Sequence, residues 1–104
     1  MRIQLLTHPG CASASATRER LVRLLALTRA DAGIEEVDVT AANAPEHLRG
    51  WGSPTVLVDG EDVAGEKSPS GPGCRLYRDA DGRLAGVPSE ALITSMLHNR
   101  GHSW

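Results

Sequence analysis

The chain has 104 residues, which suits one compact domain, and no shift in composition marks an internal boundary, so we expect a single domain over residues 1–104. The formal net charge is −2 at pH 7, with acidic and basic residues mixed, and this excludes the basic patch that nucleic acid or an anionic membrane surface needs. No apolar run approaches the roughly 20 residues of a membrane span, and residues 3–6 are too short for a signal-peptide core of about 7–15 residues. We therefore expect a cytoplasmic protein whose two cysteines are kept as thiols.

The first half of the chain predicts strands and helices in alternation. Residues 2–6 form a strand-like run that ends at the breakers of residues 8–10. Leucines then recur at helical spacing within residues 13–32, and Gly33 stands where a helix C-cap belongs. The next two predicted elements are a strand at residues 34–39 and a short helix at residues 41–48.

The second half predicts a hairpin, an insert rich in loops, and a final helix. Residues 55–58 are β-branched and apolar, and the Asp59-Gly60 step is typical of a tight turn, so residues 61–64 are expected to return as the partner strand. Residues 88–98 predict a helix with Pro88 in its first turn. The insert, at about residues 67–87, is expected to contain a turn-rich loop at 67–73, a strand at 74–77 and a turn at 79–82.

Three short motifs accompany the predicted order β-α-β-α-β-β-α. They are Cys11-Ala12-Ser13-Ala14 after the first strand, Gly52-Ser53-Pro54-Thr55 before the third, and Cys74-Arg75-Leu76-Tyr77 in the insert. Together they resemble the thioredoxin-like superfamily of thioredoxins and glutaredoxins, and most closely its small bacterial members with Cys-x-x-Ala in place of Cys-x-x-Cys. The resemblance covers residues 1–66 and the final helix. It implies an α/β domain with a central mixed four-stranded sheet flanked by helices.

The resemblance also implies where a substrate binds. In thioredoxin-like proteins the proline that matches Pro54 is cis, and its turn faces the active cysteine. The backbone of the residue before that proline, here Ser53, then pairs with an extended thiol substrate. Ser53, Pro54 and Thr55 are therefore the expected substrate-binding residues.

Cys11 is the candidate nucleophile. At the start of a helix, unpaired backbone N–H groups and the helix dipole favour the thiolate, so we expect an accessible thiol with a lowered pKa. His8 and Ser13 are expected to assist at the substrate site, through the charge of an imidazolium and through a hydroxyl that can donate to sulfur. The alternative is a buried cysteine that packs as a small apolar residue.

Cys74 is the candidate second thiol, because Ala14 occupies the position where the family has its second cysteine. Tracing the strands through the fold brings the loop before Cys74 to the sheet edge where Cys11 lies. Cys11 would then attack a disulfide, and Cys74 would resolve the mixed disulfide. Alternatively, Cys74 is a buried strand residue that packs with Leu76. If Cys74 cannot reach Cys11, Cys11 would act alone with glutathione as the resolving co-substrate, as in monothiol glutaredoxins.

Thiol–disulfide exchange is the favoured function, with a disulfide-bonded protein or a small-molecule thiol as partner and with no resident cofactor or metal. Two other functions stay open. Two facing thiolates can bind a soft ion such as mercury or copper(I). Ala14 also fits a thioredoxin-like module that has lost catalysis and only binds a protein partner. The sequence carries no indication of oligomeric state.

Overall fold

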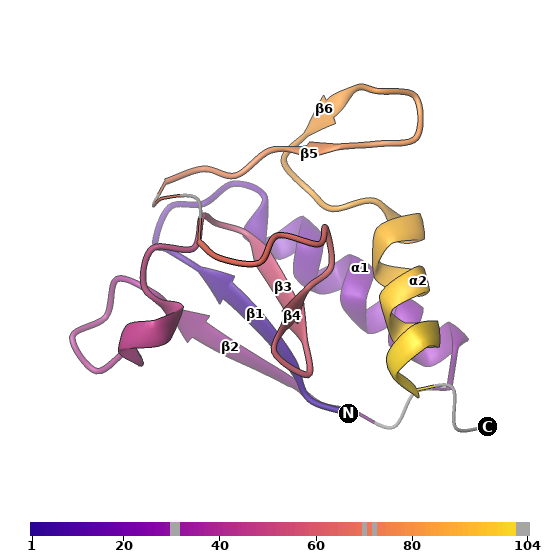
Figure 1. The fold of residues 1–104 in the computed structure, drawn as a ribbon, viewed down its shortest axis with the longest axis horizontal. Helices are drawn as coiled ribbons and strands as arrows, with labels where there is room; N and C mark the ends of the chain where they lie inside the picture. Colours follow the sequence, from indigo (N-terminus) through magenta and orange to yellow (C-terminus); the bar gives the residue numbers. More distant parts are fainter. Residues whose placement is uncertain (30–31, 70, 72, 102–104) are drawn as a thin grey trace.

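A mixed four-stranded sheet forms the centre of the computed structural model, which describes residues 1–29, 32–69, 71 and 73–101 (Figure 1). The strand order is β2-β1-β3-β4, with β1 and β2 parallel and the other neighbours antiparallel. The elements are β1 (Ile3–Thr7), α1 (Ala14–Leu27), β2 (Ile34–Asp38), the single-turn 3-10 helix η1 (Glu46–Leu48), β3 (Thr55–Val58), β4 (Glu61–Asp62), β5 (Tyr77–Arg78), β6 (Leu84–Ala85) and α2 (Glu90–Gly101). The predicted α/β class with a mixed four-stranded sheet is confirmed.

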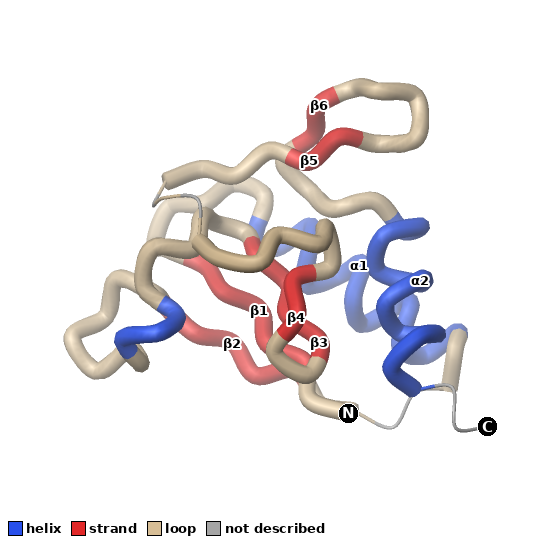
Figure 2. Tube along the Cα trace, in the orientation of Figure 1, coloured by secondary structure: helices blue, strands red, loops and turns tan. Residues whose placement is uncertain are grey.

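The sheet is covered differently on its two faces. Alternate residues of β1, Ile3 and Leu5, belong to a buried cluster with apolar side chains of α1 and α2, and the two helices lie together on that face (Figure 2). Leu6 belongs to a second cluster with Leu48 and Trp51, from the segment that carries η1. Each buried leucine or isoleucine contributes about 1.5–3 kcal/mol. These two apolar layers fix the sheet between the helices and the η1 segment.

Helix α1 is shorter than predicted. It ends at Leu27 instead of residue 32, and residues 30–31 lie outside the described part of the chain. The Thr28 hydroxyl donates to the Leu24 carbonyl at 2.8 Å, and Arg29 takes a left-handed conformation with φ 55°. The residue after the C-cap is therefore an arginine, and the prediction that Gly33 caps this helix is wrong.

The predicted second helix is reduced to the single turn of η1. Pro45 disfavours a helical conformation at the residue before it, which interrupts the predicted segment in its middle. The Arg49 guanidinium instead donates to three carbonyls of this segment, those of Ala41, Ala42 and Ala44. The segment is thus held by one side chain and not by a helical hydrogen-bond ladder.

Several elements of the second half of the chain are shorter than predicted or begin at other residues. The strand expected at residues 74–77 is confined to β5, which pairs with β6 around the turn predicted at residues 79–82. The return strand of the first hairpin, expected at residues 61–64, is limited to the two residues of β4. Helix α2 begins after Pro88, because the Ser89 side chain accepts the N–H of Leu92 at 3.1 Å and so caps the helix.

Candidate functional site

Cys11 lies in a tight turn between β1 and α1. Its N–H donates to the His8 carbonyl at 3.3 Å, and Gly10 supplies a positive φ of 81° within the turn. Ser13 is the N-cap of α1, so Cys11 stands ahead of the helix and not in its first turn. Cys11 is a free cysteine, and the residue is half-buried.

The Ser53-Pro54 loop meets the Cys11 turn. The antiparallel register pairs Leu6 with Thr55, so the end of β1 lies beside the start of β3, as the strand tracing predicted. The backbone N–H of His8 donates to the Ser53 hydroxyl at 3.2 Å. The Ser53–Pro54 peptide bond is cis, as expected. The role of this loop as a substrate-binding surface stays a prediction.

Ser53 also holds the segment that carries Cys74. Residues 73–75, which we call the Cys74 arm, run parallel to the Ser53 backbone. The Ser53 N–H donates to the Gly73 carbonyl at 2.8 Å, and the Arg75 N–H donates to the Ser53 carbonyl at 2.9 Å. Cys74 is exposed, so the alternative that it is a buried strand residue is wrong. Ser53 therefore contacts both the Cys11 turn and the Cys74 arm.

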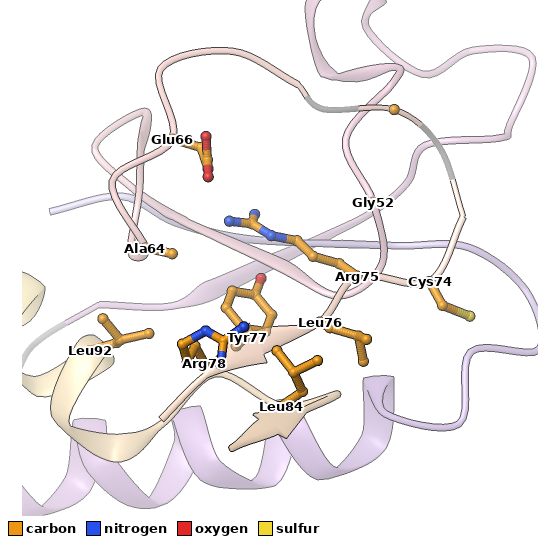
Figure 3. Close-up of a pocket in the computed structure, with 11 residues that line it drawn as sticks. Gly52, Ala64, Glu66, Cys74, Arg75, Leu76, Tyr77, Arg78, Leu84 and Leu92 are labelled. Carbon is orange, nitrogen blue, oxygen red and sulfur yellow. The ribbon is translucent and has the colours of Figure 1, made fainter. Parts of the chain in front are cut away.

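The arm is extended, and its neighbouring side chains leave it in opposite directions. Figure 3 shows Arg75 reaching inward over Tyr77, while the Cys74 sulfur points away from that cluster. This alternation is normal for an extended backbone. Burying the arginine therefore leaves the neighbouring thiol outside.

Arg75 is the centre of a buried polar network that sequence reasoning missed. Its guanidinium forms a two-point ion pair with Asp62, at 2.9 and 2.6 Å, and donates to the Thr55 hydroxyl at 3.0 Å. The side chains of Arg75 and Asp62 are only 9% and 0% exposed. The guanidinium also lies over the rings of Trp51 and Tyr77, at 5.6 and 4.5 Å from their centroids.

The electrostatics of the network follow from its burial. Burial alone would lower the pKa of Arg75, but hydrogen bonds to Asp62 and nearby negative groups outweigh it, so the pKa is raised. The only weak signals in the sequence were one acid in a strand that packs against the core and one arginine among the apolar residues of the Cys-Arg-Leu-Tyr motif.

Tyr77 links this network to the Ser53-Pro54 loop. Its ring is buried, and its hydroxyl donates to the Pro54 carbonyl. Burial raises the pKa of Tyr77 well above its ordinary value, the charge of Arg75 opposes this, and a charge on Cys11 adds a smaller increase.

The other predicted site residues have structural partners. Thr55 is buried, and its hydroxyl donates to the Gly52 carbonyl at 2.6 Å. The His8 ring has Nδ1 at 3.0 Å from the Pro9 carbonyl oxygen. The half-buried Ser13 lies against Gly86, where an added Cβ would be 2.3 Å from the Ser13 hydroxyl oxygen. These contacts give each residue a structural role, while their part in substrate binding stays a prediction.

A pocket of about 520 Å³ borders the Cys74 arm (Figure 3). Cys74, Leu76 and Leu84 line it together with Glu66 and Arg78. The N–H of Gly71, another lining residue, is already donated to the Gly50 carbonyl at 3.0 Å. The pocket therefore combines apolar and charged walls with one thiol.

Within the described residues, no group of three or more His, Cys, Asp or Glu side chains gathers as metal ligands would. Neither helix, as far as the structure describes it, has the length and apolar character needed to cross a membrane. Comparisons with protein-family models, curated proteins and solved structures found no match. The contacts of Ser53 with the Cys11 turn and with the Cys74 arm are the structural features that bear on function.

Proposed function

We propose that the chain is a thioredoxin-like thiol–disulfide exchange protein, with Cys11 as the nucleophile and Cys74 as the resolving thiol. One observation carries this proposal: Ser53 bonds to the Cys11 turn through its hydroxyl and to both sides of Cys74 through its backbone. The sheet order, the parallel β1–β2 pair and the cis bond before Pro54 agree with the thioredoxin-like resemblance.

The reaction proceeds by two exchanges that balance in atoms and electrons. The Cys11 thiolate attacks one sulfur of a substrate disulfide, forms a mixed disulfide and releases the first substrate thiolate. The Cys74 thiolate then attacks the Cys11 sulfur, forms the Cys11–Cys74 disulfide and releases the second substrate thiolate. The released thiolates take up the protons that the two cysteines lost. The substrate disulfide is reduced by two electrons, and the protein dithiol is oxidised.

Glutathione serves as the co-substrate that returns the protein to its dithiol form. Two glutathione molecules reduce the Cys11–Cys74 disulfide and leave as glutathione disulfide. The exposed position of Cys74 supports this step, because an outside thiol must reach one of the two sulfurs.

The test is to trap each intermediate. The reduced protein is mixed with glutathione disulfide, quenched in acid and analysed by mass spectrometry. We expect a Cys11–Cys74 disulfide in the wild type, a glutathione adduct on Cys11 that accumulates in Cys74→Ser, and no comparable adduct in Cys11→Ser. The proposal is wrong if the wild type forms neither product, and binding of a protein partner without redox activity then becomes the better interpretation.

A further inference from the structure

We infer that this protein acts on small disulfides and does not recognise the peptide segments around a disulfide in an extended polypeptide, because its own Cys74 arm occupies the backbone of Ser53. The inference rests on the proposed function and concerns the substrate class of the same site. It departs from the expectation that Ser53 pairs with the substrate.

The backbone groups of Ser53, next to the Cys11 turn, are already paired. An extended peptide that adds to a sheet gains affinity from main-chain hydrogen bonds, and it needs free N–H and C=O groups on the protein. Ser53 is the residue that contacts the Cys11 turn, yet its N–H is donated to Gly73 and its carbonyl accepts from Arg75. Ser53 is also only 1% exposed. A peptide can pair there only after the arm has left.

The buried ion pair between Arg75 and Asp62 keeps the arm in place. Leaving Ser53 would pull Arg75 from Asp62, whose side chain is wholly buried, and from the Thr55 hydroxyl. Separating a buried ion pair leaves charges without partners and is strongly unfavourable. Backbone bonds hold the two ends of the arm, and its last residue is also fixed by a buried side chain. The arm is therefore anchored, and Cys74 does not swing in on a flexible loop.

The pocket beside Cys74 is the space that remains for a substrate. The pocket of about 520 Å³ beside Cys74 lies within the range of about 300–1,000 Å³ that is typical of small-molecule sites. Two of its lining side chains, Leu76 and Leu84, are 59% and 57% exposed, and Glu66 and Arg78 add charges of both signs. This surface suits a compact disulfide that carries charged and apolar groups.

The experiment compares two substrates with the same kind of reacting bond. One is glutathione disulfide, and the other is a mixed disulfide between glutathione and a cysteine in the middle of a short unstructured peptide. Single-turnover formation of the Cys11–Cys74 disulfide is followed by acid quench and mass spectrometry. For the wild type we expect the peptide substrate to react no faster than glutathione disulfide.

Two variants release the arm by different means. Arg75→Met removes the ion pair, and Gly52→Ala places a Cβ 3.0 Å from the Arg75 Cβ and 3.3 Å from the Gly73 carbonyl oxygen. In both we expect the rate ratio of peptide to glutathione disulfide to rise about tenfold, through a lower KM for the peptide, since two backbone hydrogen bonds become available. Arg75→Lys keeps the charge but loses the two-point contact, so it should be intermediate. The exposed Arg83→Met is the matched control, with an unchanged ratio.

The outcomes separate the two proposals. If the wild type is oxidised by neither substrate, the proposed function fails, and this inference fails with it. If the wild type reacts faster with the peptide substrate, the proposed function stands and the inference is overturned. The inference is also wrong if a variant that is folded by circular dichroism keeps the wild-type ratio. The wild-type comparison alone decides the matter if both variants fail to fold.

Discussion

The replacement Arg75→Met tests whether the buried ion pair supports the fold as well as the arm. Arg75 makes two hydrogen bonds to Asp62 and one to Thr55, and the substitution removes all three. Asp62 then keeps a hydrogen bond from the N–H of Glu66, at 3.0 Å, but has lost the positive charge that balanced it. Removing one member of a buried ion pair typically costs about 3–5 kcal/mol. A domain of ordinary stability, about 5–15 kcal/mol, would lose a large part of its free energy of unfolding.

The assay is urea unfolding followed by far-UV circular dichroism. Arg83→Met is the control, because the same substitution at an exposed site should change the free energy of unfolding by less than about 0.5 kcal/mol. The double variant Asp62→Asn, Arg75→Met should be more stable than the sum of its single variants predicts, because it contains no unpaired buried charge. The expectation is contradicted if Arg75→Met loses as little free energy of unfolding as the control. It is also contradicted if the losses of the two single variants add up to that of the double variant.

Two further predictions follow from the titratable groups. Tyr77 is the single tyrosine, and burial raises its pKa in the folded state above the ordinary value of about 10. The stabilisation from its protonated form is thus complete below about pH 10 and falls by about 1.4 kcal/mol per pH unit above it. Tyrosinate absorbance at 295 nm should therefore appear only at the pH where circular dichroism shows unfolding. Tyr77→Phe should abolish the fall of the free energy of unfolding above about pH 10. Titration of Tyr77 near about pH 10 in the folded protein would refute the raised pKa. Hydrogen bonds from Arg18 and Arg23 lower the pKa values of Glu36 and Glu90, so their stabilisation is complete above the ordinary glutamate value of about 4.3 and is lost as the pH falls through the lowered values. At pH values below about 4.3 the urea concentration at the unfolding midpoint should decrease, and this decrease should be smaller in Glu36→Gln and in high salt. A midpoint independent of pH and salt would show that these exposed ion pairs contribute nothing to stability.

The strands were predictable where local chemistry decides them. The apolar run of β3 and the Asp59-Gly60 step predict the first hairpin, and both turn residues do have positive φ values, 51° and 84°. Chain direction in the thioredoxin-like resemblance predicted that the end of β1 lies beside the start of β3, as the register shows. Helix ends were less predictable, because leucine spacing continues smoothly toward Thr28 while the chain turns at Arg29.

The site was predictable only in outline. Chain direction in the resembling fold predicted that the loop before Cys74 emerges near Cys11. The bonds between Ser53 and the arm, however, join backbone groups and leave no side-chain pattern in the sequence. The ion pair between Asp62 and Arg75 depends on how the insert folds back over the sheet, so neither residue carries a periodic signal. Tertiary contacts of this kind decide whether Cys74 is held in place or carried on a flexible loop.

The turn between β5 and β6 follows, along the chain, the residues that locate Cys74. Gly73, Arg75 and the Tyr77 hydroxyl are all fixed before the chain reaches the turn at residues 79–82, and that turn is largely exposed. The far end of the hairpin therefore tolerates changes of length that the arm does not. A fluorescent label or an affinity tag inserted at Asp81-Gly82 would lie outside the hydrogen bonds that locate Cys74.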